Sequence, residues 1–191
     1  PTVRKFVVKS TSSVYGAEEV QRTYGELVPV AAERVIEIRD EAVIEFAGRR
    51  LRCLDTPGHA RHHFSVWDER SRSFFSGDTF GLSYREFDTD KGAFILPTST
   101  PVQFDPVALK GSIARMLLYK PEAMFLTHFS RVSDVERLGR DLFEQIDAMV
   151  AIAESSTGLA DRHEFLKRKL AELYLARATA HGCTMSPQHM H

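Results

Sequence analysis

The chain has 191 residues, of which 43% are hydrophobic, and its 25 lysines and arginines against 26 aspartates and glutamates leave a formal charge of −1. This composition is ordinary for a soluble globular protein, and the near-neutral charge argues against a nucleic-acid binder, which would carry a basic excess. No apolar run approaches the roughly 18–20 residues that cross a bilayer. Two cysteines, Cys53 and Cys183, are too few for a disulfide framework. We therefore expect a cytoplasmic protein whose residues 1–191 form a single domain and which binds neither nucleic acid nor a membrane.

Short strand-like segments, separated by turns, make up the first two thirds of the chain. The predicted strands lie at residues 6–8, 43–46, 51–54, 63–67 and 73–76. Gly48 lies between the second and the third of these, as expected for a hairpin turn. A charged turn at residues 68–72 joins the last two. These patterns predict two hairpins, one after the other.

Helical patterns dominate the last third of the chain. Asp105 stands directly before Pro106, which predicts a helix that begins with a capping carboxylate and a proline in its first turn. The helix is expected to end at Lys120, because Pro121 follows. Residues 123–126 then predict one more buried strand.

Two further helices are predicted after that strand. Ser133 and Glu136 fit a capping box, and the apolar residues that follow keep a helical period as far as Ala153. A last helix over about residues 161–181 would form a helical C-terminal extension. Residues 182–191 are expected to be a frayed tail.

Three segments place a metal-capable side chain directly after a predicted strand. They are DTPGH, which ends in His59, SGDT, which contains Asp78, and LTH, which ends in His128. Taken singly, a histidine after a strand is more often a surface or core residue, and Gly-Asp-Thr is more often a turn. Loops at strand ends, however, let a rigid scaffold aim ligands at one point. Imidazole suits zinc or iron, and a carboxylate can bridge two cations. The order of the three segments therefore favours one shared site.

In this order, the segments resemble the metallo-β-lactamase-fold superfamily of metal-dependent hydrolases, which includes glyoxalase II-like enzymes. The resemblance covers about residues 31–152 and is most specific from Asp55 to Asp78. It implies an α/β fold of the αββα four-layer sandwich type, incomplete at its N-terminus. It also implies that His59 is the third histidine of a first metal site, that Asp78 bridges both metals, and that His128 is the last histidine of the second site.

The sequence departs from that family in one respect. The family signature His-x-His-x-Asp-His is absent, no histidine precedes His59, and three ligands are too few for two metals. The early part also resembles a shortened form of its relatives, with a direct join at Lys9-Ser10 that a deletion or absent residues would explain. Half of a two-sheet sandwich would expose the inner face of its sheet. We therefore expect an upstream half, a homodimer through that face or a different fold, and we favour the first.

Other residues near these segments have two interpretations each. His62 and His63 either support the site or contact the substrate, or they simply alternate between inside and outside along a strand. In the segment 80–104, Tyr84, Arg85 and Phe94 either line a substrate pocket or pack the loop against the protein.

Two functions from different classes fit these observations. The first is a metal-dependent hydrolase in which a metal-bound hydroxide, oriented by Asp78 as the catalytic residue, attacks an ester, thioester, lactone or similar small substrate. Zinc is the default metal, with two ions per complete site, and iron or manganese suit the same ligands. The second is a truncated, non-catalytic member of the fold that acts as a binding or interaction protein. The absent signature supports the second, and the fold does not choose the substrate.

Overall fold

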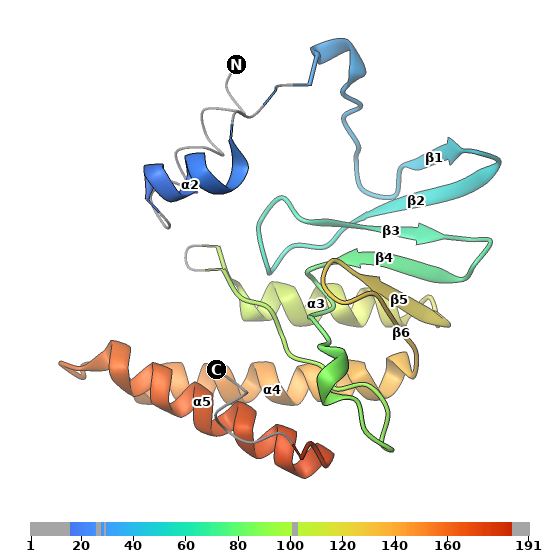
Figure 1. Cartoon of the computed structure of the whole chain (residues 1–191). Coiled ribbons are helices and arrows are strands. Elements are labelled where there is room, and N and C mark those ends of the chain that lie inside the picture. The colour runs from blue at the N-terminus through green and yellow to red at the C-terminus, as the bar shows by residue number, and fades with distance from the viewer. Residues whose placement is uncertain (1–15, 26–27, 29, 101–102, 185–191) are drawn as a thin grey trace. The chain divides into compact units, whose positions relative to one another are not determined.

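The computed structural model describes residues 16–25, 28, 30–100 and 103–184. The chain divides into two compact units, residues 1–38 and 39–191 (Figure 1). The described part of the first unit holds helix α2, Ala17–Tyr24, and a 3₁₀ turn, Ala32–Arg34. The sequence did not predict either of them. The predicted strand at residues 6–8 and the join at residues 9–10 lie outside the described residues.

The second unit is built on one mixed sheet of six strands, in which the spatial order of the strands follows the chain. The strands are β1 Val43–Phe46, β2 Arg49–Asp55, β3 Phe64–Asp68, β4 Ser73–Gly77, β5 Ala123–Leu126 and β6 Arg131–Val132. Neighbouring strands are antiparallel, except for the parallel pair β4–β5. The two predicted hairpins, β1–β2 and β3–β4, are confirmed. Strand β6, of two residues, was not predicted.

Helix α3, Pro106–Leu117, makes the crossover that the parallel pair β4–β5 requires. The carboxylate of Asp105 accepts hydrogen bonds from the backbone N–H groups of Val107 and Ala108, both at 3.0 Å, so the predicted cap is confirmed. The helix ends three residues earlier than expected, since Lys120 already has a left-handed φ of 50°.

Helix α4, Val135–Ser155, begins without the predicted capping box. Asp134 occupies the N-cap position, but its side chain makes no capping hydrogen bond. Its carboxylate instead accepts a hydrogen bond of 2.6 Å from Arg137, one turn further along. The prediction that Ser133 and Glu136 cap this helix was therefore wrong, because Asp134 occupies the N-cap position.

Helix α5, Arg162–His181, follows α4 and packs on it. The hydroxyl of Tyr174 lies 3.5 Å from the sulfur of Met149 in α4. Just beyond α5, the thiol of Cys183 donates to the backbone carbonyl of Phe87 at 3.2 Å. The prediction of a frayed tail is therefore wrong for Gly182 and Cys183, and residues 185–191 lie outside the described residues. No helix in the described ranges has both the length and the apolar character needed to cross a bilayer.

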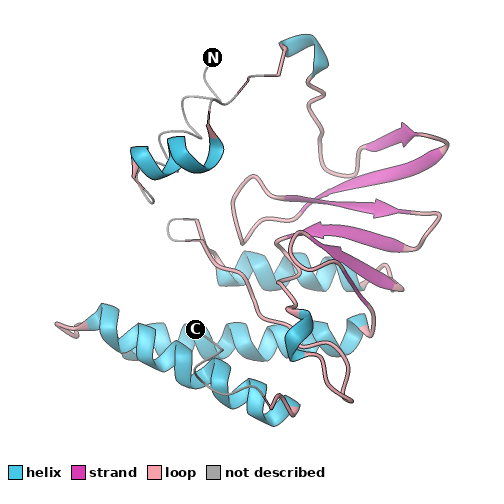
Figure 2. Ribbon diagram, viewed as in Figure 1, coloured by secondary structure: helices cyan, strands magenta, loops and turns pink. Residues whose placement is uncertain are grey.

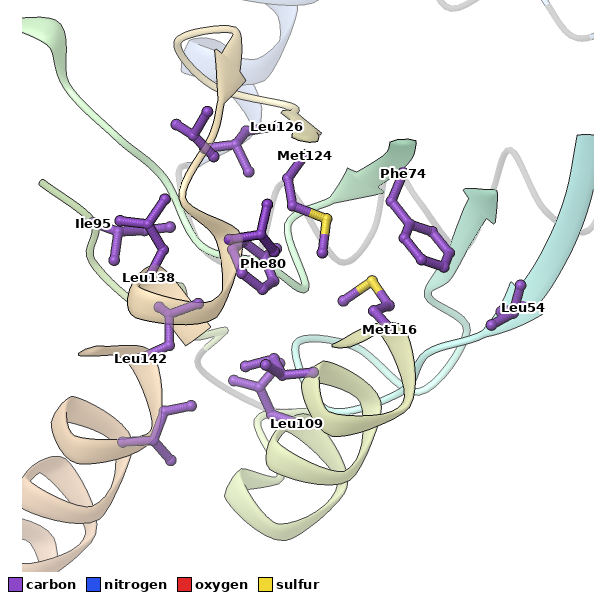
Figure 3. Packing of buried hydrophobic residues seen from close by; sticks show 14 of the residues in the cluster. Leu54, Phe74, Phe80, Ile95, Leu109, Met116, Met124, Leu126, Leu138 and Leu142 are labelled. Carbon is purple, nitrogen blue, oxygen red and sulfur yellow. The ribbon is translucent and has the colours of Figure 1, made fainter. Parts of the chain in front are cut away.

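Helices α3 and α4 cover one face of the sheet (Figure 2). Phe74 and Met124 point from that face toward Met116 of α3, Leu138 of α4 belongs to the same cluster, and all four side chains are fully buried (Figure 3). On the opposite face Phe75 is 45% exposed and stacks on Phe125 with ring centroids 5.1 Å apart. The expected α/β class is confirmed, and the described residues form one sheet with helices against one of its faces.

Candidate metal centre

The three segments singled out in the sequence meet at one edge of the sheet. Strands β2 and β4 both run antiparallel to β3, and β5 runs parallel to β4, so β2, β4 and β5 point in the same direction. Their carboxyl ends therefore lie at the same edge. His59 follows β2, Asp78 follows β4 and His128 follows β5. The topology thus gathers side chains that are far apart in the sequence.

The three side chains face one another. Nε2 of His59 lies 3.6 Å from Oδ2 of Asp78, and Nε2 of His128 lies 3.5 Å from Oδ1 of the same carboxylate. Oδ1 of Asp78 is buried and has no hydrogen-bond partner. A buried carboxylate oxygen without a partner is costly. The expected convergence of the three residues is confirmed, and it leaves an acceptor without a donor at its centre.

The proton on His59 can be placed from its hydrogen bonds. Oγ1 of Thr98 donates to the backbone carbonyl of Asp78 at 2.6 Å, and Nδ1 of His59 lies 3.0 Å from the same hydroxyl. Because the single hydroxyl proton goes to the carbonyl, Nδ1–H of His59 must be the donor to Thr98. Nε2 of the neutral ring then carries a lone pair that faces the carboxylate of Asp78.

Burial keeps the imidazole of His59 neutral. It lowers the pKa of His59 below its ordinary value, and the negative charge of Asp78 only partly opposes this effect. A lone pair and a carboxylate oxygen that face each other repel, unless a proton or a metal cation lies between them. The electrostatics of the pair therefore favour a bound positive ion.

The spacing of the donor atoms also fits a metal. Two ligands of one tetrahedral ion, each bonded at about 2.0–2.2 Å, lie roughly 3.3–3.6 Å apart. The two measured nitrogen–oxygen separations, 3.6 and 3.5 Å, fall within that range. Among the described residues, however, no three His, Cys, Asp or Glu side chains form a closed metal-holding cluster. Instead, His59 and His128 each form a separate pair with Asp78. These three residues are a partial set of ligands, as expected from the sequence.

The loop that carries His128 is held by Arg85. The Arg85 guanidinium donates to the carbonyls of Phe129 and Arg131, both at 2.7 Å. Phe129 and Ser130 have left-handed φ angles of 69° and 76°, which are unfavourable for residues with side chains. Among the two interpretations of Arg85, the geometry favours packing, since its donors clamp the strained loop next to His128.

The other open residues of this region also have structural partners. The Tyr84 ring lies 4.3 Å from that of Phe129, and Phe94 packs on Phe87 at 5.6 Å. His62 is exposed and His63 is turned inward. The contact of Thr98 with His59 was not predicted, since nothing near residue 98 indicates a contact with a histidine 39 positions earlier.

A cavity of about 600 Å³ lies beside the segment that follows Thr98, although none of His59, Asp78 and His128 lines it. Thr100 lies in its wall and donates to the backbone carbonyl of His59 at 2.7 Å. The remaining wall is largely apolar and includes Phe104, Met149 and Leu166. Arg162 adds a guanidinium, whose Nε donates to Ser156 at 2.9 Å. The cavity therefore combines a largely apolar surface with one guanidinium and one carboxylate, that of Glu154.

Comparison with known proteins gives a consistent result. A family model described as the metallo-beta-lactamase superfamily matches residues 2–128. The metallo-beta-lactamase fold-containing protein ST1585 of Sulfurisphaera tokodaii is 32% identical over 101 residues, which are 53% of this chain and 35% of that protein.

Solved structures show the same relation. The crystal structure of archaeal ST1585 aligns with a TM-score of 0.61 at 27% identity and covers 92% of this chain and 63% of that one. A metallo-beta-lactamase family protein from Thermus thermophilus, TTHA1429, aligns with a TM-score of 0.56 at 21% identity and the same 92% of this chain, against 60% of its own. The sequence alignment thus spans about a third of ST1585, and the structural alignments span less than two thirds of ST1585 and of TTHA1429.

Proposed function

The chain belongs to the metallo-β-lactamase superfamily. We therefore propose that it is part of a metal-dependent hydrolase and that His59, Asp78 and His128 bind divalent metal. One observation carries this proposal. The Nε2 atoms of His59 and His128 face the two oxygens of the Asp78 carboxylate, whose buried Oδ1 has no hydrogen-bond partner, and a divalent cation would compensate this arrangement. Imidazole and carboxylate donors suit zinc, iron and manganese, and zinc is the default.

Each residue has a separate task in this proposal. Asp78 supplies negative charge from two oxygens, one toward each histidine. Thr98 keeps the proton of His59 on Nδ1, so that Nε2 stays open to a ligand. When bound, a divalent cation lowers the pKa of a neighbouring water and polarises the oxygen of the scissile group. Partial burial of His59, whose side chain is 16% exposed, strengthens the local electrostatics.

The substrate we propose is a small ester, thioester or lactone with an apolar portion. The cavity beside Thr100 supports this choice, because its wall is largely apolar and its charged groups, Arg162 and Glu154, are of opposite sign. Its volume of about 600 Å³ lies within the usual range for small-molecule pockets.

The alternative is a binding protein that uses the same fold without turnover. It is favoured by one observation, namely the lack of a closed ligand cluster among the described residues. The two functions differ in whether the protein turns over substrate once its site holds metal. A hydrolase turns over substrate in proportion to bound metal, whereas a binding protein does not.

Metal titration followed by activity measurement tests the proposal. The protein is stripped with a chelator, titrated with Zn²⁺, Mn²⁺ or Fe²⁺, analysed for metal by mass spectrometry and assayed on an aryl ester and an acyl thioester. The chain's own three ligands predict at most one weakly held metal, lost in His59→Asn. The matched control is His62→Asn, since His62 is exposed and close in sequence. Equal metal content in both variants would contradict the assignment of His59.

A further inference from the structure

One inward-facing histidine near the proposed centre has both ring nitrogens engaged. Nε2 of His63 accepts the backbone N–H of Asp78 at 3.0 Å. Nδ1 lies 2.9 Å from Oγ1 of Thr79 and 3.1 Å from Oγ1 of Thr56. Neither nitrogen is free to bind a metal, which separates His63 from His59 and His128.

The hydrogen bonds around His63 run in one consistent direction. Because Nε2 accepts from Asp78, the ring carries its proton on Nδ1. Oγ1 of Thr79 donates to the carbonyl of Thr56 at 3.1 Å, so toward His63 it is an acceptor. The chain of donors therefore leads from Asp78 N–H to His63, from His63 to Thr79, and from Thr79 to Thr56. Both threonines are at most 1% exposed, so water cannot readily replace these partners.

The ring of His63 also lies directly against the backbone that precedes Asp78. A Cβ added to Gly77 would come within 2.4 Å of Nε2 of His63. Gly77 has a left-handed φ of 55°, which glycine adopts without strain. The close approach of ring and backbone therefore depends on glycine at this position.

Asp78 is thus held through its backbone on both sides. Its N–H is bound by His63 and its carbonyl by Thr98. Oδ1 of its carboxylate, in contrast, is left without a hydrogen bond. Such an arrangement fixes where the carboxylate points without using its ligand oxygen.

We infer that His63 is a positioning residue, which orients Asp78 toward His59 and His128 by accepting its backbone N–H. This inference deepens the proposed function and rests on it. A bound metal would gain affinity from a ligand that is already oriented.

Zinc affinity and the melting temperature, measured together, test the positioning role. His63→Phe keeps a ring but removes the acceptor, and we expect zinc binding at least about tenfold weaker than in the wild type, measured by competition with a chromophoric chelator. His63→Gln retains an acceptor and should recover part of the affinity. A His63→Phe protein with lowered melting temperature but wild-type zinc affinity would show a purely structural role and overturn the inference.

A second pair of variants covers failure of His63→Phe to fold. Thr79→Val removes the nearer of the two hydroxyls that Nδ1–H can reach, while Thr79→Ser retains it. We expect Thr79→Val to bind zinc more weakly than Thr79→Ser. Equal affinities of the two would count against the inference.

A metal-free measurement separates this inference from the proposed function. In ¹⁵N NMR of the chelator-treated protein, a scalar coupling across the N–H···N bond should join the Asp78 amide nitrogen to Nε2 of His63. If the coupling is present but no zinc binds, the proposed function fails while the contact stands. If zinc binds but the coupling is absent and His63 carries its proton on Nε2, the positioning role fails alone.

Discussion

Two aspartates lie at opposite ends of the β3–β4 pair, and they are used in different ways. Asp68 ends β3 and is fully buried. Its carboxylate pairs with the guanidinium of Arg49 and accepts hydrogen bonds from the Ser71 hydroxyl at 2.6 Å and the Arg70 N–H at 3.1 Å. Asp78 follows β4 and is held by its backbone, whereas its buried Oδ1 has no partner.

The difference shows how a structural carboxylate can be told from a ligand. Asp68 has its negative charge compensated within the protein, so it has nothing left to bind. Asp78 has its position fixed but its charge uncompensated. A bound cation would offset this cost at Asp78.

Removal of the negative charge of Asp78 should give the largest loss of metal affinity and hydrolysis. Asp78→Asn keeps the shape but removes the negative charge, so we expect metal affinity and hydrolysis to fall by at least about 10–100-fold. The melting temperature of the metal-free protein should change little, because Oδ1 makes no hydrogen bond. Chelator competition and calorimetry measure the two quantities. If Asp78 merely ends a turn, Asn would serve as well and affinity would not change.

The same substitution at Asp68 should have the opposite profile. Asp68→Asn leaves Arg49 without its partner and weakens a buried network, so we expect a loss of about 1–3 kcal/mol in the free energy of unfolding. Metal affinity should stay at the wild-type value, since Asp68 lies at the other end of the strand pair. Urea denaturation measures the loss. A stable Asp68→Asn protein with weakened metal binding would reverse the roles assigned to the two aspartates.

A lower pH should reduce the stability that the Asp68 carboxylate contributes. Burial alone would raise the pKa of Asp68, but hydrogen bonds from Ser71 and Arg49 outweigh it, and the pKa lies below its usual value of 3.8. A lowered folded-state pKa gives stability that is present above the unfolded value and is lost as the pH falls through the folded one. The stability difference between wild type and Asp68→Asn should therefore be full at pH 6 and shrink below about pH 4. A difference that is independent of pH would mean that charge is not its cause.

A smaller effect is expected at Arg85, which acts on the site through the His128 loop. Arg85→Met removes the donors to the carbonyls of Phe129 and Arg131, so the strained loop is released and metal affinity should fall by about tenfold. Arg85→Lys keeps the charge but not the forked geometry and should lie in between. Unchanged affinity in Arg85→Met would show that the loop keeps its conformation without the clamp.

Local patterns predicted those parts of the fold that local interactions stabilise. Asp105 and Pro106 placed the start of α3, and Gly48 placed the first hairpin turn, because a cap and a turn each depend on a few adjacent residues. The start of α4 was predicted wrongly. Ser133 and Glu136 suggested a capping box, but Asp134 occupies the N-cap position.

By itself, the sequence determined which side chains have metal-binding chemistry and, through the order of strands, that His59, Asp78 and His128 follow three strand ends. Only the tertiary structure decided how these side chains are oriented and which imidazole nitrogen carries the proton. Thr98 reaches His59 across 39 positions and His63 reaches Asp78 across 15, and neither contact leaves a periodic or local signal. The proton position on an imidazole and the orientation of a carboxylate depend on hydrogen bonds formed only when the strands and loops have packed together.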